Sequence, residues 1–238
     1  MKNFPKTAFL LGAGLGTRLR PLTDACPKPL LPLGGRPMIF FAMDSLLAAG
    51  TERFIINTHH AAEVYERVFP QKIYRGAPVE LVYEPVLLDT GGGLKNIAPR
   101  LAPNDENLLV YNGDILAAPD FSRLADAHER SRAAATLLLR TDPRGNVNFD
   151  DASGTVRDLR DRLGNAGTRR CRFTGIYLVA RRFFDEIPAG KIESVVEAFL
   201  RVIARGSDAI CGVVDDAAAW RDLGTPEDYA AANAELSK

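Results

Sequence analysis

The stretch that decides the fold is Leu11-Gly12-Ala13-Gly14-Leu15-Gly16-Thr17-Arg18-Leu19-Arg20-Pro21-Leu22-Thr23, which continues the apolar run Thr7–Leu11. An apolar run that stops at glycine predicts a buried strand with a tight loop after it. Glycines there let the backbone approach a ligand, so that several N–H groups can converge on phosphate oxygens. The spacing differs from the dinucleotide fingerprint, because Thr17 stands where a third glycine is required. It also lacks the Gly-Lys-Ser/Thr of a P-loop.

Two basic side chains accompany this glycine loop. Arg18 places a planar, permanently charged guanidinium just beyond the turn, which suits polyphosphate oxygens. Lys28 stands between Pro27 and Pro29, and the two prolines make its segment stiff and extended. The whole string therefore favours a site for a phosphate that is being transferred. The simpler interpretation is a plain turn with solvated basic residues.

The rest of the chain alternates between strand and helix patterns, which predicts a mostly parallel α/β sheet with helices on both faces. Ligands of such sheets bind outside the carboxyl ends of the strands, where the most unusual loops of this chain fall. No linker or repeat divides the chain, so we expect one domain over residues 1–238. The expected strands are Thr7–Leu11, Arg53–Asn57, Val79–Tyr83, Asn107–Tyr111, Ala133–Arg140, Asn146–Phe149, Thr155–Leu159, Arg172–Val179 and Ala209–Val214. A loop over Asp89–Gly93 is expected to open a further helix at Leu94. The other expected helices are Pro37–Ala49, Ala61–Val68, Asp120–Arg130, Ile192–Ala204 and Pro226–Leu236.

Composition excludes several classes of protein. The 238 residues carry 30 Lys+Arg and 30 Asp+Glu, so the formal net charge is zero, which argues against a generic nucleic-acid binder. Three distant cysteines form no CxxC pair and suit a reducing compartment. We find neither a signal peptide nor a stretch of roughly 20 apolar residues that could span a membrane. We therefore expect a soluble, cytoplasmic protein without nucleic-acid or membrane partners.

The glycine loop followed by Pro27-Lys28-Pro29-Leu30 resembles the start of the sugar-1-phosphate nucleotidylyltransferases. The resemblance implies a Rossmann-like three-layer α/β/α fold of the nucleotide-diphospho-sugar transferase type, with a mixed, mostly parallel sheet. It implies that the nucleotide is bound by about residues 1–118, and the sugar and metal by about 119–238. Arg18 and Lys28 would be catalytic. The implied nucleotide-binding residues are Gly12, Ala13, Gly14, Gly16, Thr17, Thr90, Gly91, Gly92 and Asn112.

Two aspartates are candidates for a Mg²⁺ site. Asp114 follows an apolar strand pattern, and carboxylates at a strand's carboxyl end suit this hard ion. The alternative at Asn112-Gly113 is a hairpin turn. Asp222 lies in Trp220–Tyr229, where Thr225 and Pro226 also predict the start of a helix. Taken alone, Asp222 would be a surface aspartate, but the resemblance implies that it is the second metal ligand.

The substrates are less clear from the sequence. The resemblance implies sugar contacts at Gly145, Thr174 and Gly175, for which a turn and a strand with a bulge glycine are alternatives. Many members of the family that use glucose 1-phosphate carry a Glu-Lys-Pro motif. This chain has Arg160-Asp161-Arg162 in the corresponding stretch, which argues against glucose 1-phosphate as the substrate. The chain most resembles the compact N-acetylmuramate-1-phosphate uridylyltransferases, which favours UTP. Mannose- or heptose-1-phosphate guanylyltransferases are the alternative.

The expected reaction joins a nucleoside triphosphate to a sugar 1-phosphate and releases pyrophosphate. No general base is required, because the sugar phosphate is already an anionic nucleophile. A non-catalytic nucleotide-sensing or scaffold domain is the alternative of another class. The glycine spacing argues against a third possibility, a nicotinamide-dependent oxidoreductase, because it differs from the dinucleotide fingerprint. The sequence predicts no oligomeric state.

Overall fold

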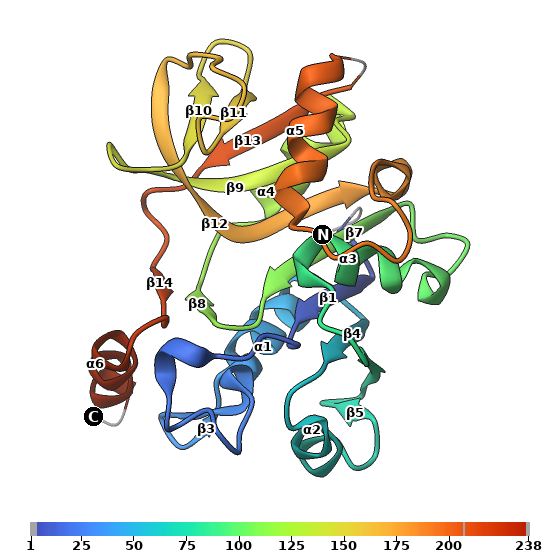
Figure 1. Ribbon diagram of the computed structural model, residues 1–238, viewed down its shortest axis with the longest axis vertical. Coiled ribbons are helices and arrows are strands. Elements are labelled where there is room, and N and C mark those ends of the chain that lie inside the picture. Colours follow the sequence, from blue (N-terminus) through green and yellow to red (C-terminus); the bar gives the residue numbers. More distant parts are fainter. Residues whose placement is uncertain (1–3, 207, 237–238) are drawn as a thin grey trace.

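The computed structural model describes residues 4–206 and 208–236 and has one ten-stranded sheet with helices on both faces (Figure 1). The strand order is β10-β11-β13-β9-β12-β7-β1-β4-β6-β5. Its strands are β1 (Thr7–Leu11), β4 (Arg53–Thr58), β5 (Ile73–Tyr74), β6 (Ala77–Tyr83), β7 (Asn107–Asn112), β9 (Ala135–Thr141), β10 (Val147–Asp150), β11 (Thr155–Leu159), β12 (Arg169–Ala180) and β13 (Ile210–Val214). The helices are α1 (Ile39–Ala49), α2 (Ala62–Val68), α3 (Asp89–Asn96), α4 (Phe121–Ser131), α5 (Val195–Arg205) and α6 (Pro226–Leu236).

The sheet is mixed, as expected, but parallel pairing does not dominate it. Strands β6, β4, β1 and β7 run parallel to one another, and β13 runs parallel to β9. Pairings of β12 with β7, β9 and β10, and of β11 with β10 and β13, are antiparallel. The connections account for part of this pattern: no α-helix lies in the fully described stretch between β9 and β12, and neighbouring strands joined by a short turn must run antiparallel.

Side chains that alternate along the strands build the three layers. Phe9, Ile55 and Val110 face a cluster that includes residues of α3 and α5. Leu10 and Ile56 face a second cluster with residues of α1, α2 and α4. Because successive side chains of a strand point to opposite faces, each strand is buried on both sides, which accounts for the continuous apolar runs.

Local sequence signals set most helix ends. Gly50 ends α1 in the left-handed conformation with φ 112°. Asp120 caps α4 by accepting a bond from the Ser122 N–H at 3.0 Å. The expected start of α5 at Ile192 is wrong, because Ser194 caps a helix that begins at Val195. The expected loop over Asp89–Gly93 is also wrong, because α3 already begins at Asp89.

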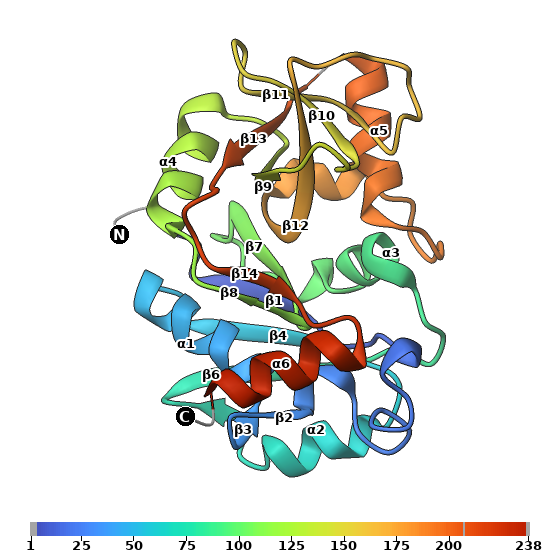
Figure 2. The same cartoon turned by 90° about the vertical axis from the view of Figure 1, so that its left-hand side faces the viewer.

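The C-terminal segment returns from the second half of the chain to the first (Figure 2). Strand β14 (Trp220–Asp222) pairs with β8 (Ile115–Ala117), and α6 packs beside the small hairpin of β2 (Pro32–Leu33) and β3 (Arg36–Pro37). There the Gly34 N–H donates to Asn233 Oδ1 at 2.7 Å. Within residues 4–206 and 208–236, no helix is long and apolar enough to span a membrane. The three cysteines are unpaired.

Candidate functional site

A cavity of about 470 Å³ opens at the carboxyl ends of the four parallel strands β6, β4, β1 and β7. Leu11, the last residue of β1, pairs with Asn57 on one side and Asn112 on the other. The side chains and loops that follow these strands therefore meet at one edge of the sheet. The lining residues are Leu11, Ala13, Gly14, Gly16, Thr17, Arg18, Leu19, Lys28, Pro29, Asn57, Leu87, Asp89, Thr90, Asn112, Asp114, Ile192 and Gly224.

Three charged side chains meet at the edge of this cavity: Lys28 and Asp114 line it, and Asp222 lies beside them. Lys28, held in a 3₁₀ helix over Lys28–Leu30, is nearly buried, and its Nζ donates to Asp114 Oδ2 at 2.6 Å. The same Nζ lies 3.9 Å from Asp222 Oδ1. Residues separated by almost 200 positions thus form one cluster, in which a single ammonium lies beside two carboxylates.

The pairing of β8 with β14 brings the two aspartates together. In this antiparallel pair Asp222 lies opposite Ile115, the residue after Asp114, and the Leu223 N–H points to the Asp114 carbonyl at 3.4 Å. The hairpin between β7 and β8 that Asn112-Gly113 could have formed is absent, because β8 pairs with β14 instead. Glycine is required at position 113 because the chain packs closely on β1 there: a Cβ would lie 2.5 Å from the Leu11 carbonyl oxygen.

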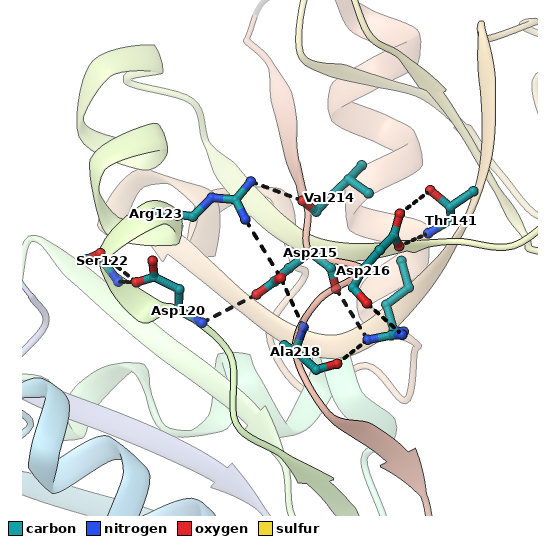
Figure 3. A network of polar contacts seen from close by, with 9 residues as sticks. Asp120, Ser122, Arg123, Thr141, Val214, Asp215, Asp216 and Ala218 are labelled. Atoms are coloured by element: carbon teal, nitrogen blue, oxygen red, sulfur yellow. Dashed lines mark hydrogen bonds and ion pairs between the residues drawn. The ribbon is translucent and has the colours of Figure 1, made fainter.

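Upstream of β14, a polar network fixes the turn where the chain leaves β13 (Figure 3). The buried carboxylate of Asp215 accepts from the Ala218 N–H at 3.2 Å and lies 3.7 Å from the Arg123 guanidinium. Arg140 of β9 donates to the carbonyls of residues 215, 216 and 218. The segment that carries Asp222 is therefore anchored to the sheet on one side, and α6 anchors it on the other.

Asp222 has an unsatisfied oxygen. Its side chain is 44% exposed overall, yet Oδ1 is buried and is bonded to no described residue. Burial, followed by the charge of Asp114, raises the pKa of this carboxyl above its ordinary value, against the opposing charges of Lys28 and Arg18. The Lys28 ammonium lies 3.9 Å from this oxygen but makes no hydrogen bond to it. A buried oxygen without a hydrogen bond is costly unless a ligand satisfies it, and a metal cation is a suitable ligand for a carboxylate.

The donor set fits a hard divalent cation that shares its coordination with a substrate. Among the described residues no group of three or more His, Cys, Asp or Glu side chains could hold a metal ion. Mg²⁺ is commonly held by one or two carboxylates, with phosphate oxygens and water completing its shell. Asp114 and Asp222, with the unsatisfied Oδ1, meet that requirement.

Gly16 and Gly224 make room for the basic residues. Gly16 has φ 62°, and a Cβ there would lie 2.8 Å from Thr23 and 3.3 Å from the Lys28 Cβ, so the glycine loop packs directly on the lysine segment. A Cβ on Gly224 would lie 2.9 Å from both terminal nitrogens of Arg18 and 3.0 Å from Asp222 Oδ1. The Arg18 guanidinium therefore lies against the backbone beside Asp222.

The structure brings most of the predicted nucleotide-site residues to the cavity. Asp222 lines an adjoining hollow of about 600 Å³ that shares Arg18 and Gly224 with the first. Gly12, Gly91 and Gly92 are not in the cavity lining. The N–H groups of Gly91 and Gly92 both donate to the Glu193 carbonyl, so these glycines allow α3 to approach the segment before α5. The predicted residues that line the cavity are Ala13, Gly14, Gly16, Thr17, Arg18, Lys28, Thr90, Asn112 and Asp114.

The three predicted sugar contacts lie outside the cavity lining. A Cβ on Gly145 would lie 2.0 Å from the Cys171 carbonyl oxygen, so close packing on β12 requires glycine there. Thr174 is buried and donates to the Leu138 carbonyl at 2.8 Å. Gly175 has φ 82° at a bulge of β12, and a Cβ there would lie 2.6 Å from Asn112 Nδ2. The bulge of β12 thus packs against Asn112, which lines the cavity.

Sequence reasoning missed several cavity residues. Asn57 is the penultimate residue of β4, and its place near the carboxyl end of a strand was a usable signal. Asp89 belongs to the Asp89–Gly93 segment that the resemblance places against the nucleoside, but its own place in the lining and its left-handed backbone with φ 61° were not predicted. Leu87 and the exposed Ile192 reach the cavity from loops, and a loop's position depends on tertiary packing.

Comparison with known proteins assigns the family. A family model described as nucleotidyl transferase matches residues 7–238, and the chain belongs to that family. The chain is 39% identical over 234 residues to a mannose-1-phosphate guanylyltransferase of Mycobacterium tuberculosis, covering 96% of this chain and 64% of that protein. It is 29% identical over 252 residues to the N-acetylmuramate alpha-1-phosphate uridylyltransferase of Caulobacter vibrioides, covering 100% of both chains. The chain thus spans less than two thirds of the former relative.

Solved structures share the fold. HddC from Yersinia pseudotuberculosis, complexed with GMP-PN, superposes with a TM-score of 0.77 at 21% identity, covering 97% of this chain and 99% of that one. UTP-bound UGPase from Acinetobacter baumannii gives a TM-score of 0.78 at 19% identity, covering 98% and 93%. The resemblance read from the glycine loop is confirmed at the level of family and fold.

Proposed function

We propose that this chain transfers a nucleotidyl group from a nucleoside triphosphate to a sugar 1-phosphate, yielding a nucleoside-diphosphate sugar and pyrophosphate. The observation that carries the proposal is the convergence of Lys28 Nζ on the carboxylates of Asp114 and Asp222 at the glycine-loop cavity. Family membership and the cavity's position at the carboxyl ends of parallel strands support it.

The chemistry follows from the charges. An oxygen of the sugar phosphate attacks the α-phosphorus, forming one P–O bond, while the bond to the β-phosphate oxygen breaks and pyrophosphate leaves. Two anions must meet, so the catalytic task is to neutralise and position them. Lys28 and Arg18 supply positive charge, and the glycine loop leaves open space beside Gly14 for a phosphate.

Asp114 and Asp222 would hold Mg²⁺. When bound, the ion supplies Lewis-acid stabilisation of charge on the phosphoryl oxygens. The glycines, Thr90 and Asn112 would contact the nucleotide, and the hollow lined by Asp222 and Arg172 would lie next to the reacting phosphate. Thr174 and Gly175 would act on the sugar through the β12 bulge behind Asn112, and Gly145 through its close packing on β12 at Cys171.

Two substrate pairs are supported by different relatives. The 39% identical relative favours GTP with mannose 1-phosphate, and the full-length relative favours UTP with N-acetylmuramate 1-phosphate, the pair expected from the sequence. A matrix of nucleoside triphosphates against sugar 1-phosphates, with pyrophosphate release followed in Mg²⁺ and in chelator, tests the function and separates the pairs. Release requires both substrates and the metal if the proposal is correct. No release from any pair would favour the nucleotide-sensing or scaffold alternative.

A further inference from the structure

A chain of hydrogen bonds crosses the carboxyl ends of three neighbouring parallel strands, β1, β4 and β6. Glu84, the residue after β6, is fully buried, and its Oε1 accepts a bond from Asn57 Nδ2 at 2.8 Å. Asn57, in β4, accepts at Oδ1 from the Gly12 N–H at 2.8 Å, just after β1. We call these two side chains the Glu84–Asn57 relay. It ends on the first residue of the glycine loop.

The same carboxylate also holds residues 88–90, which we call the 88–90 wall because Asp89 and Thr90 line the cavity. Glu84 Oε2 accepts from the Leu88 N–H at 3.1 Å, immediately before Asp89 and Thr90, which line the cavity. Glu84 itself is held by its backbone: its N–H donates to the Thr58 carbonyl at 2.8 Å. Its carbonyl accepts from His59 Nδ1 at 2.7 Å. One buried group therefore links the glycine loop to the wall formed by residues 88–90.

Two glycines make the relay possible. A Cβ on Gly93 would lie 2.9 Å from both Asn57 Nδ2 and Glu84 Oε1, so only glycine lets α3 pass over the pair. A Cβ on Gly12 would lie 2.6 Å from Tyr65 Oη and 2.7 Å from the Asn57 carbonyl. Tyr65 also donates to the Gly12 carbonyl at 3.0 Å. Both peptide groups of Gly12 are thus fixed by side chains from other elements.

We propose that Asn57 and Glu84 are positioning residues that set the spacing between the glycine loop and the 88–90 wall, and thereby the affinity for the nucleoside triphosphate. This inference rests on the function proposed above. The relay has a fixed polarity, since the carboxylate accepts twice while the amide donates once and accepts once. A buried polar group that loses its hydrogen-bond partner is costly. A substitution that changes a donor of the relay into an acceptor, or an acceptor into a donor, should therefore displace the loop bonded to that residue.

This polarity gives a swap test. In Glu84→Gln, the new amide must direct its NH₂ either at Asn57 Nδ2 or at the Leu88 N–H, so two donors face each other. In Asn57→Asp, a second carboxylate faces Glu84. The double variant Asn57→Asp/Glu84→Gln reverses the middle bond: the new amide donates to the new carboxylate and still accepts from Leu88, and Gly12 keeps its acceptor.

A matched control lies at the other end of β1. The buried carboxylate of Asp105 accepts from Thr7 Oγ1 at 3.0 Å and from the Ala102 N–H at 2.8 Å. Asp105→Asn disturbs a similar network that is remote from the cavity. It should lower the melting temperature and leave nucleotide affinity unchanged, which separates positioning from general stability.

The test is calorimetric titration of the native chain and these variants with GTP and UTP in the presence of Mg²⁺. Each single variant should weaken binding about tenfold or more, which corresponds to about 1.4 kcal/mol, and the double variant should return to within about threefold of the native chain. If a single variant does not fold, a folded double variant with native affinity supports the relay.

Other outcomes overturn it. Native affinity in both single variants, or a double variant as weak as the sum of the singles, would overturn the relay alone. A native chain that binds no nucleotide would overturn both the relay and the proposed function. Binding that depends on the relay, without any transfer to a sugar phosphate, would overturn the function and support the relay.

Discussion

The Nζ of Lys28 lies 2.6 Å from Oδ2 of Asp114 and is almost fully enclosed, with the side chain 8% exposed. The ammonium therefore compensates the negative charge of this carboxylate. Because Asp222 lies on its other side, the lysine belongs at once to the phosphate-binding basic residues and to the carboxylate pair. The charges of this site are interdependent.

The Lys28→Met variant tests this interdependence. Without the ammonium, the two carboxylates repel each other, so we expect a lower melting temperature and a loss of nucleotidyl transfer of roughly 100-fold or more. Added Mg²⁺ should raise the melting temperature of the variant more than that of the native chain, because the ion replaces the missing charge. Equal shifts in a thermal-denaturation titration would contradict the assignment of Asp114 and Asp222 to one cation site.

Gly224→Ala tests the position of Arg18. The new Cβ would lie 2.9 Å from the guanidinium nitrogens, which are the end of a flexible side chain and can move aside. We expect a small change in melting temperature and a fall in kcat of roughly 10- to 100-fold, since displacement of a positioning group by about 1 Å has effects of this size. Unchanged kcat in steady-state assays would show that Arg18 does not act from this position.

Arg140→Gln tests the anchor upstream of β14. The variant loses the guanidinium bonds to the carbonyls of residues 215, 216 and 218, so unfolding free energy should fall by about 2–3 kcal/mol. The Mg²⁺ concentration for half-maximal activity should rise, because Asp222 follows this segment. Arg144→Gln, which changes an exposed arginine in the connection between β9 and β10, is the control and should leave both quantities unchanged. Equal behaviour of the two variants would contradict the anchoring role.

His128 predicts a pH dependence of stability. Burial, and to a lesser extent the charge of Arg182, lowers the pKa of this histidine from 6.5 to about 4 in the folded chain. Between these values the unfolded chain binds the extra proton and the folded chain does not, so stability falls as the pH drops from 6.5 to 4. Above pH 6.5 the contribution is fully present.

The loss amounts to about 3 kcal/mol over that window. Chemical denaturation at several pH values, compared with His128→Gln, measures it. The variant should lose this part of the slope, because a glutamine does not titrate while it can still contact Thr136 or Asn107. Parallel slopes would show that other groups cause the dependence.

Local signals predicted most elements of the fold. The strand before Gly12 and the helices expected over Pro37–Ala49 and Asp120–Arg130 are confirmed, because their patterns depend on neighbouring residues. The structure shows that Gly50 ends the first of these helices and that Asp120 caps the second. Helix α3 was partly missed, because three consecutive glycines disfavour a helix and only packing on the Glu193 carbonyl holds them in one. The antiparallel pairing in the second half of the chain was not predicted, because the sequence of a strand does not indicate which strand it pairs with.

The residues of the candidate site also fall into two groups: those that local sequence identified and those that only the three-dimensional structure brings together. Arg18 and Lys28 were identified from their own loops. The proximity of Asp222 to Asp114 depends on the β8–β14 pairing across more than 100 residues, and only the resemblance to a family pointed to it. Asn57 and Glu84 lie in ordinary strand contexts, and their connection to Gly12 is visible only in three dimensions.

The most direct test of the central claim is Mg²⁺-dependent pyrophosphate release by Asp222→Ala, measured with the substrate pair that the native chain turns over. The control is Asp126→Ala, which removes an exposed aspartate of α4. We predict that Asp222→Ala abolishes turnover while its melting temperature shows an intact fold, and that Asp126→Ala behaves like the native chain. Near-native turnover by Asp222→Ala would contradict the two-aspartate metal site on which the proposed reaction depends.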